Sequence, residues 1–156
     1  MMKKISPYEL QFNPFSAIHR QWAMVTTRAG GVTNTMTASW GGVGILWNKP
    51  VAYVFLRPQR YTRELMDSSE LFSLCFLPED YREQLSYCGS HSGRDGDKLA
   101  VCHFSATDLD GAPVLEQAQL ALTCRKLFRQ QLDPSCFKDI SLDTANYPGK
   151  DYHFLY

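Results

Sequence analysis

Two short polar stretches contain residues whose types and spacing suit a cofactor with both a planar ring and a phosphate. The first is Asn34-Thr35-Met36-Thr37-Ala38-Ser39-Trp40-Gly41. Successive side chains of a strand alternate between faces, so one face would carry the hydroxyls of Thr35, Thr37 and Ser39, and the other Asn34, Met36, Ala38 and Trp40. Small hydroxyl side chains let a planar ligand approach the main chain, whose N–H groups can meet ring nitrogens and carbonyl oxygens. Judged alone, a half-buried strand with a solvated hydroxyl face is the commoner explanation.

The second stretch is Arg57-Pro58-Gln59-Arg60-Tyr61-Thr62, which lies between an apolar strand and a predicted helix. A phosphate needs charged donors in a fork geometry, and arginine supplies them. The start of a helix adds unpaired backbone N–H groups and the positive end of the helix dipole. We therefore expect Arg57, Arg60, Tyr61 and Thr62 to bind a phosphate. Judged alone, a capped surface helix with solvated arginines is again commoner.

The polar loop from Ser90 to Lys98 is a third candidate. Ser92, Arg94 and Lys98 place several donors on a glycine-containing backbone, and Lys98 offers a second positive charge for a phosphate. The functional interpretation is a loop that closes over a ligand. The alternative is a solvated surface loop.

Other chemistries find little support in the sequence. There is no G-x-S-x-G elbow and no Walker-type nucleotide motif, and the carboxylates of Glu79-Asp80 and Asp95/Asp97 suit turns and caps. Cys88-x-x-His91 followed by Cys102-His103 resembles a zinc set, but adjacent residues of a strand point to opposite faces. We therefore predict no metal site and name no catalytic residue.

The composition indicates one globular domain over residues 1–156, with 44% apolar and 13% aromatic residues. Lys+Arg and Asp+Glu both total 16, which argues against nucleic acid or an acidic membrane as a partner. No stretch is long enough for a membrane span, and the N-terminus lacks the apolar core of a secretory signal. Five irregularly spaced cysteines suit reduced thiols, so a cytoplasmic location is expected.

The remaining sequence predicts short strands with a few short helices. The expected strands are residues 22–28, 32–40, 51–57, 72–77, 114–116, 120–130 and 152–156. Helices are expected over 63–69, with Thr62 as N-cap, and from Pro78 to about Tyr87, closed by Gly89. Residues 99–105 fit a helix or a strand, 133–151 look irregular, and Gly41, Gly42 and Gly44 would loosen the backbone. The fold class that fits is mainly β, an antiparallel barrel with helical decorations, rather than a parallel βαβ fold.

The order of these motifs resembles the flavin reductase-like family with its FMN-binding split β-barrel. The resemblance rests on N-T-M-T-A-S-W-G, then R-P-Q-R-Y-T, then S-L-C-F-L, then C-G-S-H-S-G-R-D-G-D-K, and covers about residues 15 to 130. Family members commonly continue past the Tyr-His-x-x-Tyr segment into another short strand, whereas this sequence stops at Tyr156.

The resemblance implies FMN as cofactor, bound close to the subunit interface of a homodimer. Asn34 to Trp40 would line the isoalloxazine ring, largely through backbone groups, and Arg57, Arg60, Tyr61 and Thr62 would hold the phosphate. Cys88, Gly89, Ser92 and Lys98 would lie near the ring or the phosphate, from either chain.

Such a protein would be an FMN-dependent oxidoreductase that takes hydride from NAD(P)H and passes electrons to a flavin or another small acceptor. Because the flavin carries the redox chemistry, no catalytic dyad is needed. One alternative is a flavoredoxin-like carrier that exchanges electrons with a redox protein. Another is a ligand-binding barrel that has lost flavin.

Overall fold

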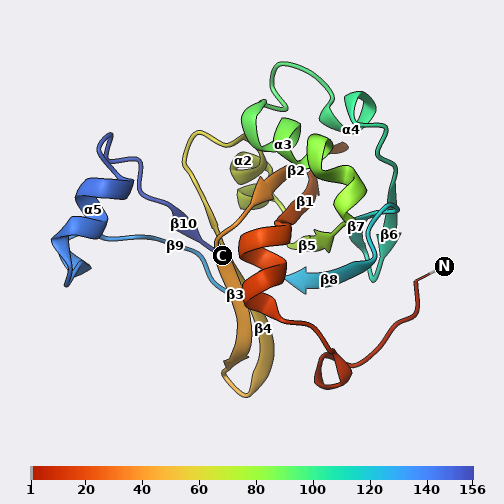
Figure 1. The fold of residues 1–156 in the computed structure, drawn as a ribbon, viewed down its shortest axis with the longest axis horizontal. Coiled ribbons are helices and arrows are strands. Elements are labelled where there is room, and N and C mark those ends of the chain that lie inside the picture. The colour runs from red at the N-terminus through yellow and green to blue at the C-terminus, as the bar shows by residue number, and fades with distance from the viewer. Residues whose placement is uncertain (1) are drawn as a thin grey trace.

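The computed structural model describes residues 2–156 as two antiparallel sheets, a small hairpin and several short helices (Figure 1). The strands are β1 (Ala23–Ala29), β2 (Val32–Ala38), β3 (Gly41–Leu46), β4 (Lys49–Leu56), β5 (Leu71–Phe76), β6 (Ala106–Leu109), β7 (Ala112–Leu115), β8 (Leu120–Arg125), β9 (Gln130–Gln131) and β10 (Phe154–Leu155). The α-helices are α1 (Pro14–Ser16), α2 (Tyr61–Ser68), α3 (Arg82–Ser90), α4 (Lys98–Val101) and α5 (Ile140–Asn146). Single 3-10 turns occur at Pro7–Glu9, Glu79–Tyr81 and Pro134–Cys136, and a π-helical turn at Ala17–Gln21. The predicted class, mainly β and antiparallel with short helices, is confirmed.

The first sheet has the strand order β2-β1-β5-β8 and carries the ring-binding candidates on its edge strand. Gly30 and Gly31 join β1 to β2 with φ of 55° and 77°, a turn that glycine adopts without strain. The register pairs Thr26 with Thr35 and Ala23 with Ala38. This places residues 34–38 beside the central strand.

The second sheet has the order β3-β4-β10-β9. The β3–β4 hairpin turns at Trp47 and Asn48, which both have positive φ. Strand β4 ends at Leu56, immediately before Arg57, so the sheet fixes where the phosphate-binding candidates begin. β10 pairs with the same end of β4, Phe154 opposite Leu56.

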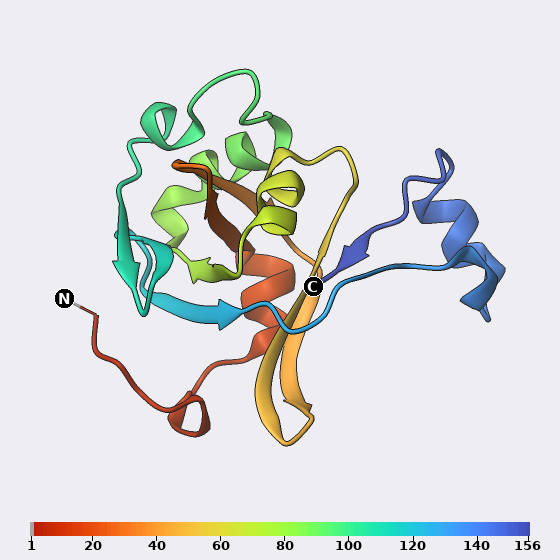
Figure 2. The ribbon, with the colours of Figure 1, turned by 180° about the vertical axis from the view of Figure 1, so that it is seen from behind.

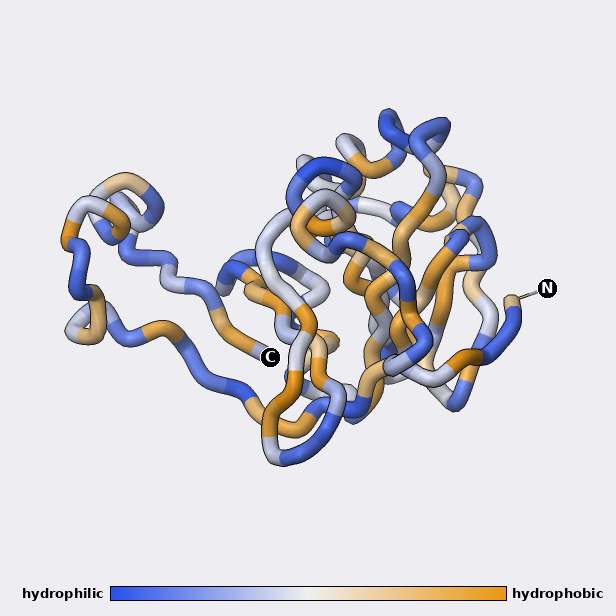
Figure 3. Tube along the Cα trace, turned by 60° about the horizontal axis from the view of Figure 1, so that its bottom comes forward, coloured by the Kyte–Doolittle hydropathy of each residue, from blue (hydrophilic) through white to orange (hydrophobic). Residues whose placement is uncertain are grey.

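Two clusters of buried apolar side chains form the core. One lies between the sheets and includes Val25, Met36, Leu56 and Phe76. The other lies under α3 and α4 and consists of Met24, Cys75, Leu77, Leu85, Cys88, Cys102, Phe104, Val114, Leu115 and Ala118. Figure 3 shows the hydrophobic segments gathered in the strands of the barrel body, while hydrophilic residues predominate in the loops. A groove of about 490 Å³, lined mainly by apolar side chains, lies beside β4 and β8.

Residues 132–151 form an arm that leaves the barrel body and carries α5, visible as the blue segment in Figures 1 and 2. The sequence predicts an irregular stretch here, which is wrong for residues 140–146. Asp139 caps α5, since its carboxylate accepts from the backbone N–H of Ser141 at 3.0 Å. The Asp-x-Ser pattern was a readable signal of this helix.

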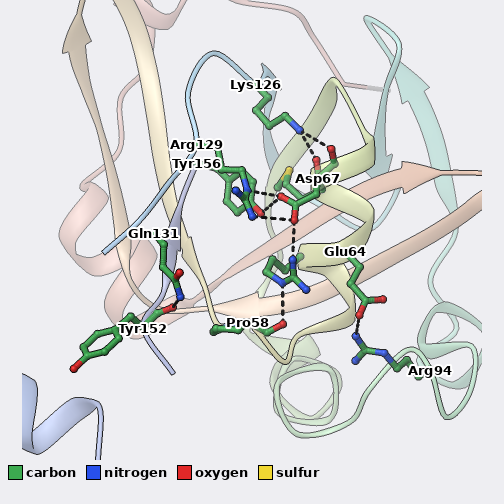
Figure 4. A network of polar contacts seen from close by, with 11 residues as sticks. Pro58, Glu64, Asp67, Arg94, Lys126, Arg129, Gln131, Tyr152 and Tyr156 are labelled. Carbon is green, nitrogen blue, oxygen red and sulfur yellow. Dashed lines mark hydrogen bonds and ion pairs between the residues drawn. The ribbon is translucent and has the colours of Figure 1, made fainter. Parts of the chain in front are cut away.

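The strand predicted over 120–130 is also wrong in the middle. The chain leaves the sheet after Arg125 because two long side chains turn toward the C-terminal end of α2 (Figure 4). Lys126 Nζ donates to the carbonyl of Met66 at 2.6 Å, and Arg129 Nε donates to the carboxylate of Asp67 at 2.7 Å. Tyr156 donates its hydroxyl to the same carboxylate, so the last residue of the chain is fastened to α2.

Three further predicted boundaries are corrected. Gly41, Gly42 and Gly44 lie in strand β3, where a side chain at Gly41 would strike the backbone carbonyl of Tyr53. Helix α3 continues through Gly89 to Ser90, and residues 98–101 are the helix α4. Within the described residues, no helix is long and apolar enough to cross a membrane, and no group of three or more acidic, His or Cys side chains could hold a metal ion.

Candidate functional site

The candidate site lies where strand β2 meets the start of α2. Asn34 Nδ2 donates to Thr62 Oγ1 at 2.9 Å, and both side chains are buried. The predicted bounds of the helix, 63–69 with Thr62 as N-cap, are wrong at the start. The helix begins at Tyr61, and its N-cap is Arg60. The hydroxyl of Thr62 serves a distant strand instead of the local backbone. This bond joins the two stretches that the sequence singles out.

The N-terminal end of α2 keeps its capacity to bind an anion. Arg60 is extended, with φ −72° and ψ 129°, and within residues 2–156 no side chain caps the helix there. The first N–H groups of a helix have no intrahelical partner, so this uncapped end presents donors and the positive end of the dipole. A phosphate suits such a position.

The loop 91–97 lies against this helix end. Gly93 fits there because it has no side chain: an added Cβ would stand 2.8 Å from Tyr61 Cδ1 and would overlap the amide of Asn34. Arg94 donates to the carbonyl of Gln59 at 2.9 Å and pairs with Glu64 (Figure 4). Its guanidinium carbon lies 5.2 Å from the centroid of the Tyr61 ring. The loop thus covers the start of α2.

Two cations converge on the last turn of α3. Arg60 donates to the carbonyls of Gly89 at 2.8 Å and Cys88 at 3.0 Å. Lys98, only 3% exposed, donates to the carbonyls of Cys88 at 2.9 Å and His91 at 3.1 Å. Positive charge at a helix C-terminus is favourable, so both residues fasten α3 to the site.

Burial governs the electrostatics of these cations. Burial, followed by the nearby positive charge of Arg60, lowers the pKa of Lys98 to about 8. Burial also lowers the pKa of Arg60, which remains a cation at any physiological pH. A buried anion beside them would be stabilised strongly.

Helix α3 packs directly on β2. Thr37 Oγ1 donates to the carbonyl of Leu85 at 2.5 Å, and a Cβ at Gly89 would contact Thr37 Cβ at 3.4 Å. Small residues on both elements allow this close approach. Thr37 and Gly89 therefore lie beside one another, as the expected ring site requires.

Trp40 follows β2 and is exposed, at 43% for the residue as a whole. Its ring centroid is 5.1 Å from that of His153, a buried residue whose Nδ1 lies 2.7 Å from the hydroxyl of Tyr147. Burial, followed by the charge of Arg57, lowers the pKa of His153 to about 4, so the imidazole is neutral. The sequence interpretation missed His153 and Tyr147. The sequence signal for this aromatic cluster was the occurrence of three ring side chains, Tyr147, Tyr152 and His153, within seven residues.

Arg57 is held by the arm. Its guanidinium pairs with Asp151 at 2.8 Å, donates to the carbonyl of Asn146 at 3.0 Å and stacks 5.0 Å from the Tyr147 ring centroid. Gln59 also donates to Asp151, at 3.0 Å. The carboxylate of Asp151 thus occupies two donors of the stretch that the sequence assigns to a phosphate.

The structure brings together most, but not all, of the predicted site residues. Around the α2–α3 corner lie Asn34, Thr37, Arg60, Tyr61, Thr62, Cys88, Gly89 and Lys98. Thr35 and Met36 turn their side chains into the interior, where Thr35 Oγ1 lies 2.9 Å from Thr26 Oγ1. Ser39 is half-buried next to Trp40, and the Ser92 hydroxyl accepts from the backbone of Arg94 at 3.2 Å. Gly93 and Arg94 also lie at this corner. They belong to the loop that the sequence predicts to close over a ligand, although the resemblance assigned only Ser92 and Lys98 of that loop.

Comparison with known proteins gives one family and several similar folds. The model of the Flavin reductase like domain matches residues 15–134. The flavoredoxin from Methanosarcina acetivorans superposes with a TM-score of 0.66 at 22% identity, over 86% of this chain and 63% of its own. The FMN-binding protein from Thermus thermophilus with bound 1-cyclohex-2-enone gives 0.65 at 23% identity, over 99% and 73%. The flavoredoxin of Desulfovibrio vulgaris (Miyazaki F) gives 0.67 at 19%, over 99% and 72%.

These structural similarities establish a shared fold. The chain spans less than two thirds of the M. acetivorans flavoredoxin. No curated protein sequence matches the chain.

Proposed function

Because the chain belongs to the flavin reductase-like family, we propose that it is an FMN-binding oxidoreductase. The observation that carries the proposal is the convergence of β2, α2 and the loop 91–97 on one corner. There the Asn34–Thr62 hydrogen bond joins strand and helix, and the uncapped end of α2 lies under Gly93 and Arg94. FMN-binding proteins among the similar folds support the choice of cofactor.

The residues at this corner fit the phosphate end of FMN. The donors are the backbone N–H groups of the first turn of α2, the hydroxyl of Thr62 and the guanidinium groups of Arg60 and Arg94. Several charge-assisted donors around one position suit a dianion. Arg57, which the sequence also assigns to the phosphate, pairs with Asp151 instead.

The residues along β2 fit the ring end. Thr37, Ser39 and Trp40 lead from the buried corner to the exposed edge, and backbone N–H groups there would orient the ring. When bound, FMN supplies two-electron redox chemistry. The protein binds it, orients it and excludes water from one side. A neutral His153 behind Trp40 adds no charge to this edge.

The finer proposal is an NAD(P)H-dependent flavin reductase that delivers electrons to a flavin or another small acceptor. The exposed indole of Trp40 marks an edge that a second planar molecule can reach. The second candidate is a flavoredoxin-like electron carrier, and the two flavoredoxins among the similar folds favour it.

One experiment separates the two candidates. The purified protein is mixed with NADH or NADPH, and oxidation is followed by the loss of absorbance of the reduced nicotinamide, with and without added free flavin. Sustained oxidation that depends on added flavin supports the reductase. Slow oxidation of both nucleotides, with rapid bleaching of bound FMN by a reduced redox protein, supports the carrier.

We also propose that the protein works as a homodimer. The arm exposes Ile140 (65%) and Leu142 (51%), apolar side chains that are costly to leave in water. A second copy covering the arm would bury them. Sedimentation velocity of the wild-type protein tests this: a concentration-independent monomer would contradict it.

A further inference from the structure

Two of the cysteine thiols lie in contact inside the protein. Sγ of Cys88 is 3.6 Å from Sγ of Cys102, and both residues are buried. Cys88 is in the last turn of α3, and Cys102 follows α4 directly. The chain between them contains the loop 91–97, which covers the start of α2.

We propose that Cys88 and Cys102 form a redox centre of their own, a dithiol that a peroxide converts to a disulfide. The two sulfur atoms need to approach by about 1.5 Å to reach the bond length of a disulfide. Each residue lies at the end of a helix. The backbone moves more readily at a helix end than in the middle of a helix. The proposal stands on this geometry and does not depend on the proposed function.

The reaction balances with one molecule of hydrogen peroxide. The Cys102 thiol loses its proton, and its sulfur attacks a peroxide oxygen, so that the O–O bond breaks and a sulfenic acid and one water form. The Cys88 sulfur then attacks the Cys102 sulfur, the S–O bond breaks, and a second water leaves with the Cys88 proton. The two thiols lose two electrons and the peroxide gains them.

Cys102 is the better attacking thiol because Cys88 is completely buried, while Cys102 is slightly accessible. Burial raises the pKa of Cys88 to about 12 and also raises that of Cys102, and the positive charge of Lys98 opposes both shifts. The thiols therefore stay protonated near neutrality, and the reaction accelerates as the pH rises. Such a pair persists as a dithiol until a small oxidant reaches it.

The disulfide would change the candidate site mechanically. It would join the last turn of α3 to α4 and close the chain between residues 88 and 102 into a ring. Gly93 and Arg94 lie within that ring, so the loop over Tyr61 would lose freedom. Tryptic cleavage after the exposed Arg94 should then become slower in the oxidised protein.

The test uses the full chain with Cys136→Ser, which removes an exposed thiol that could link two molecules. The protein, with and without added FMN, is treated with hydrogen peroxide at about pH 8.5, where a larger fraction of each thiol is ionised than at neutral pH. It is then alkylated under denaturing conditions and examined by mass spectrometry. We expect three results: a mass lower by two hydrogen atoms, a peptide in which Cys88 is linked to Cys102, and the return of both thiols after treatment with dithiothreitol.

Cys102→Ser should abolish the linked peptide, and Cys124→Ser, which removes another poorly accessible thiol, should retain it. The proposal is overturned if both thiols are alkylated after treatment, if they gain oxygen without linking, or if a different pair links. The linked peptide in the chain with Cys102 intact decides the matter even if Cys102→Ser misfolds. A protein that links these cysteines but binds no FMN would refute the proposed function alone.

Discussion

At the scale of single residues, the Asn34–Thr62 hydrogen bond is the contact that joins the two predicted halves of the site. Both groups are buried, so each would be left unsatisfied without the other. Thr62 is the second residue of α2, where its hydroxyl bonds to Asn34 instead of capping the helix.

Thr62→Val keeps the shape of the side chain but removes the acceptor for the Asn34 amide. We expect the free energy of unfolding to fall by about 1–3 kcal/mol, the cost of a buried unsatisfied donor. Urea titration measures this. Thr107→Val, at an exposed position of β6, is the matched control and should change stability little. Equal stability of both variants would show that the Asn34 amide finds another partner.

His153 makes stability depend on pH. Its pKa is lowered from 6.5 to about 4, first by burial and then by the charge of Arg57. The unfolded chain therefore binds the proton more readily, so this contribution is complete above the ordinary pKa and is lost as the pH falls from 6.5 toward 4. Between pH 6.5 and 4, the free energy of unfolding of His153→Gln should therefore fall by about 1–3 kcal/mol less than that of the wild type.

Urea titrations at several pH values check this, with His19→Gln as control because His19 is exposed. A His153→Gln protein with the same pH dependence as the wild type would show that the imidazole is not buried as a neutral group.

At the scale of elements, the close packing of the loop 91–97 on α2 is the most specific feature. Gly93 touches Asn34 and Tyr61, whereas a Cβ at Gly96 would meet no atom within 4 Å. The two glycines therefore differ in packing although they share one loop.

Gly93→Ala should displace the loop and weaken FMN binding by roughly tenfold, which corresponds to about 1.4 kcal/mol. Gly96→Ala should bind FMN like the wild type, since the added methyl group has open space. Quenching of flavin fluorescence measures both. Equal affinities would mean that the loop does not take part in the site.

The contact between Tyr156 and Asp67 fastens the last strand to α2. Burial opposes the ionised Asp67, but hydrogen bonds from Tyr156 and Arg129 prevail and lower its pKa. Tyr156→Phe should therefore destabilise the fold by about 1–2 kcal/mol and raise the pKa of Asp67. Thermal unfolding and NMR titration of the carboxylate measure the two effects; Tyr8→Phe, at an exposed position, is the control. An unaltered melting temperature would argue that this fastening contributes nothing.

At the scale of the whole molecule, local patterns predicted the barrel class and most strands. Alternation along 72–77, the glycine turn at 30–31 and the apolar run before Pro58 are local signals that tertiary structure preserved. The arm could not be placed in space from its sequence. Its position depends on contacts of Arg57 with Asn146, Tyr147 and Asp151, which lie 89 to 94 residues later in the sequence. Contacts between residues so far apart leave no local sequence pattern.

Part of the candidate site could be anticipated in the same way. The sequence singled out Asn34, Arg60 and Thr62 because their residue types, in a strand and at a helix start, suit a cofactor, and the structure brings them together. Their binding of a cofactor stays a prediction. The roles of Arg60 and Lys98 in holding α3 were not foreseen, because hydrogen bonds to distant carbonyls leave no signature in spacing. Gly93 shows the same limit, since its need for glycine arises only from Tyr61 and Asn34 lying opposite.

Titration of the purified apoprotein with FMN tests the account most directly. Flavin fluorescence should be quenched to a saturating, one-per-chain endpoint in the wild type and in Thr107→Val. Thr62→Val should bind roughly tenfold more weakly, because the strand–helix corner loses its internal hydrogen bond. An unquenched wild-type titration, or identical curves for the two variants, would contradict the claim that this corner holds the cofactor.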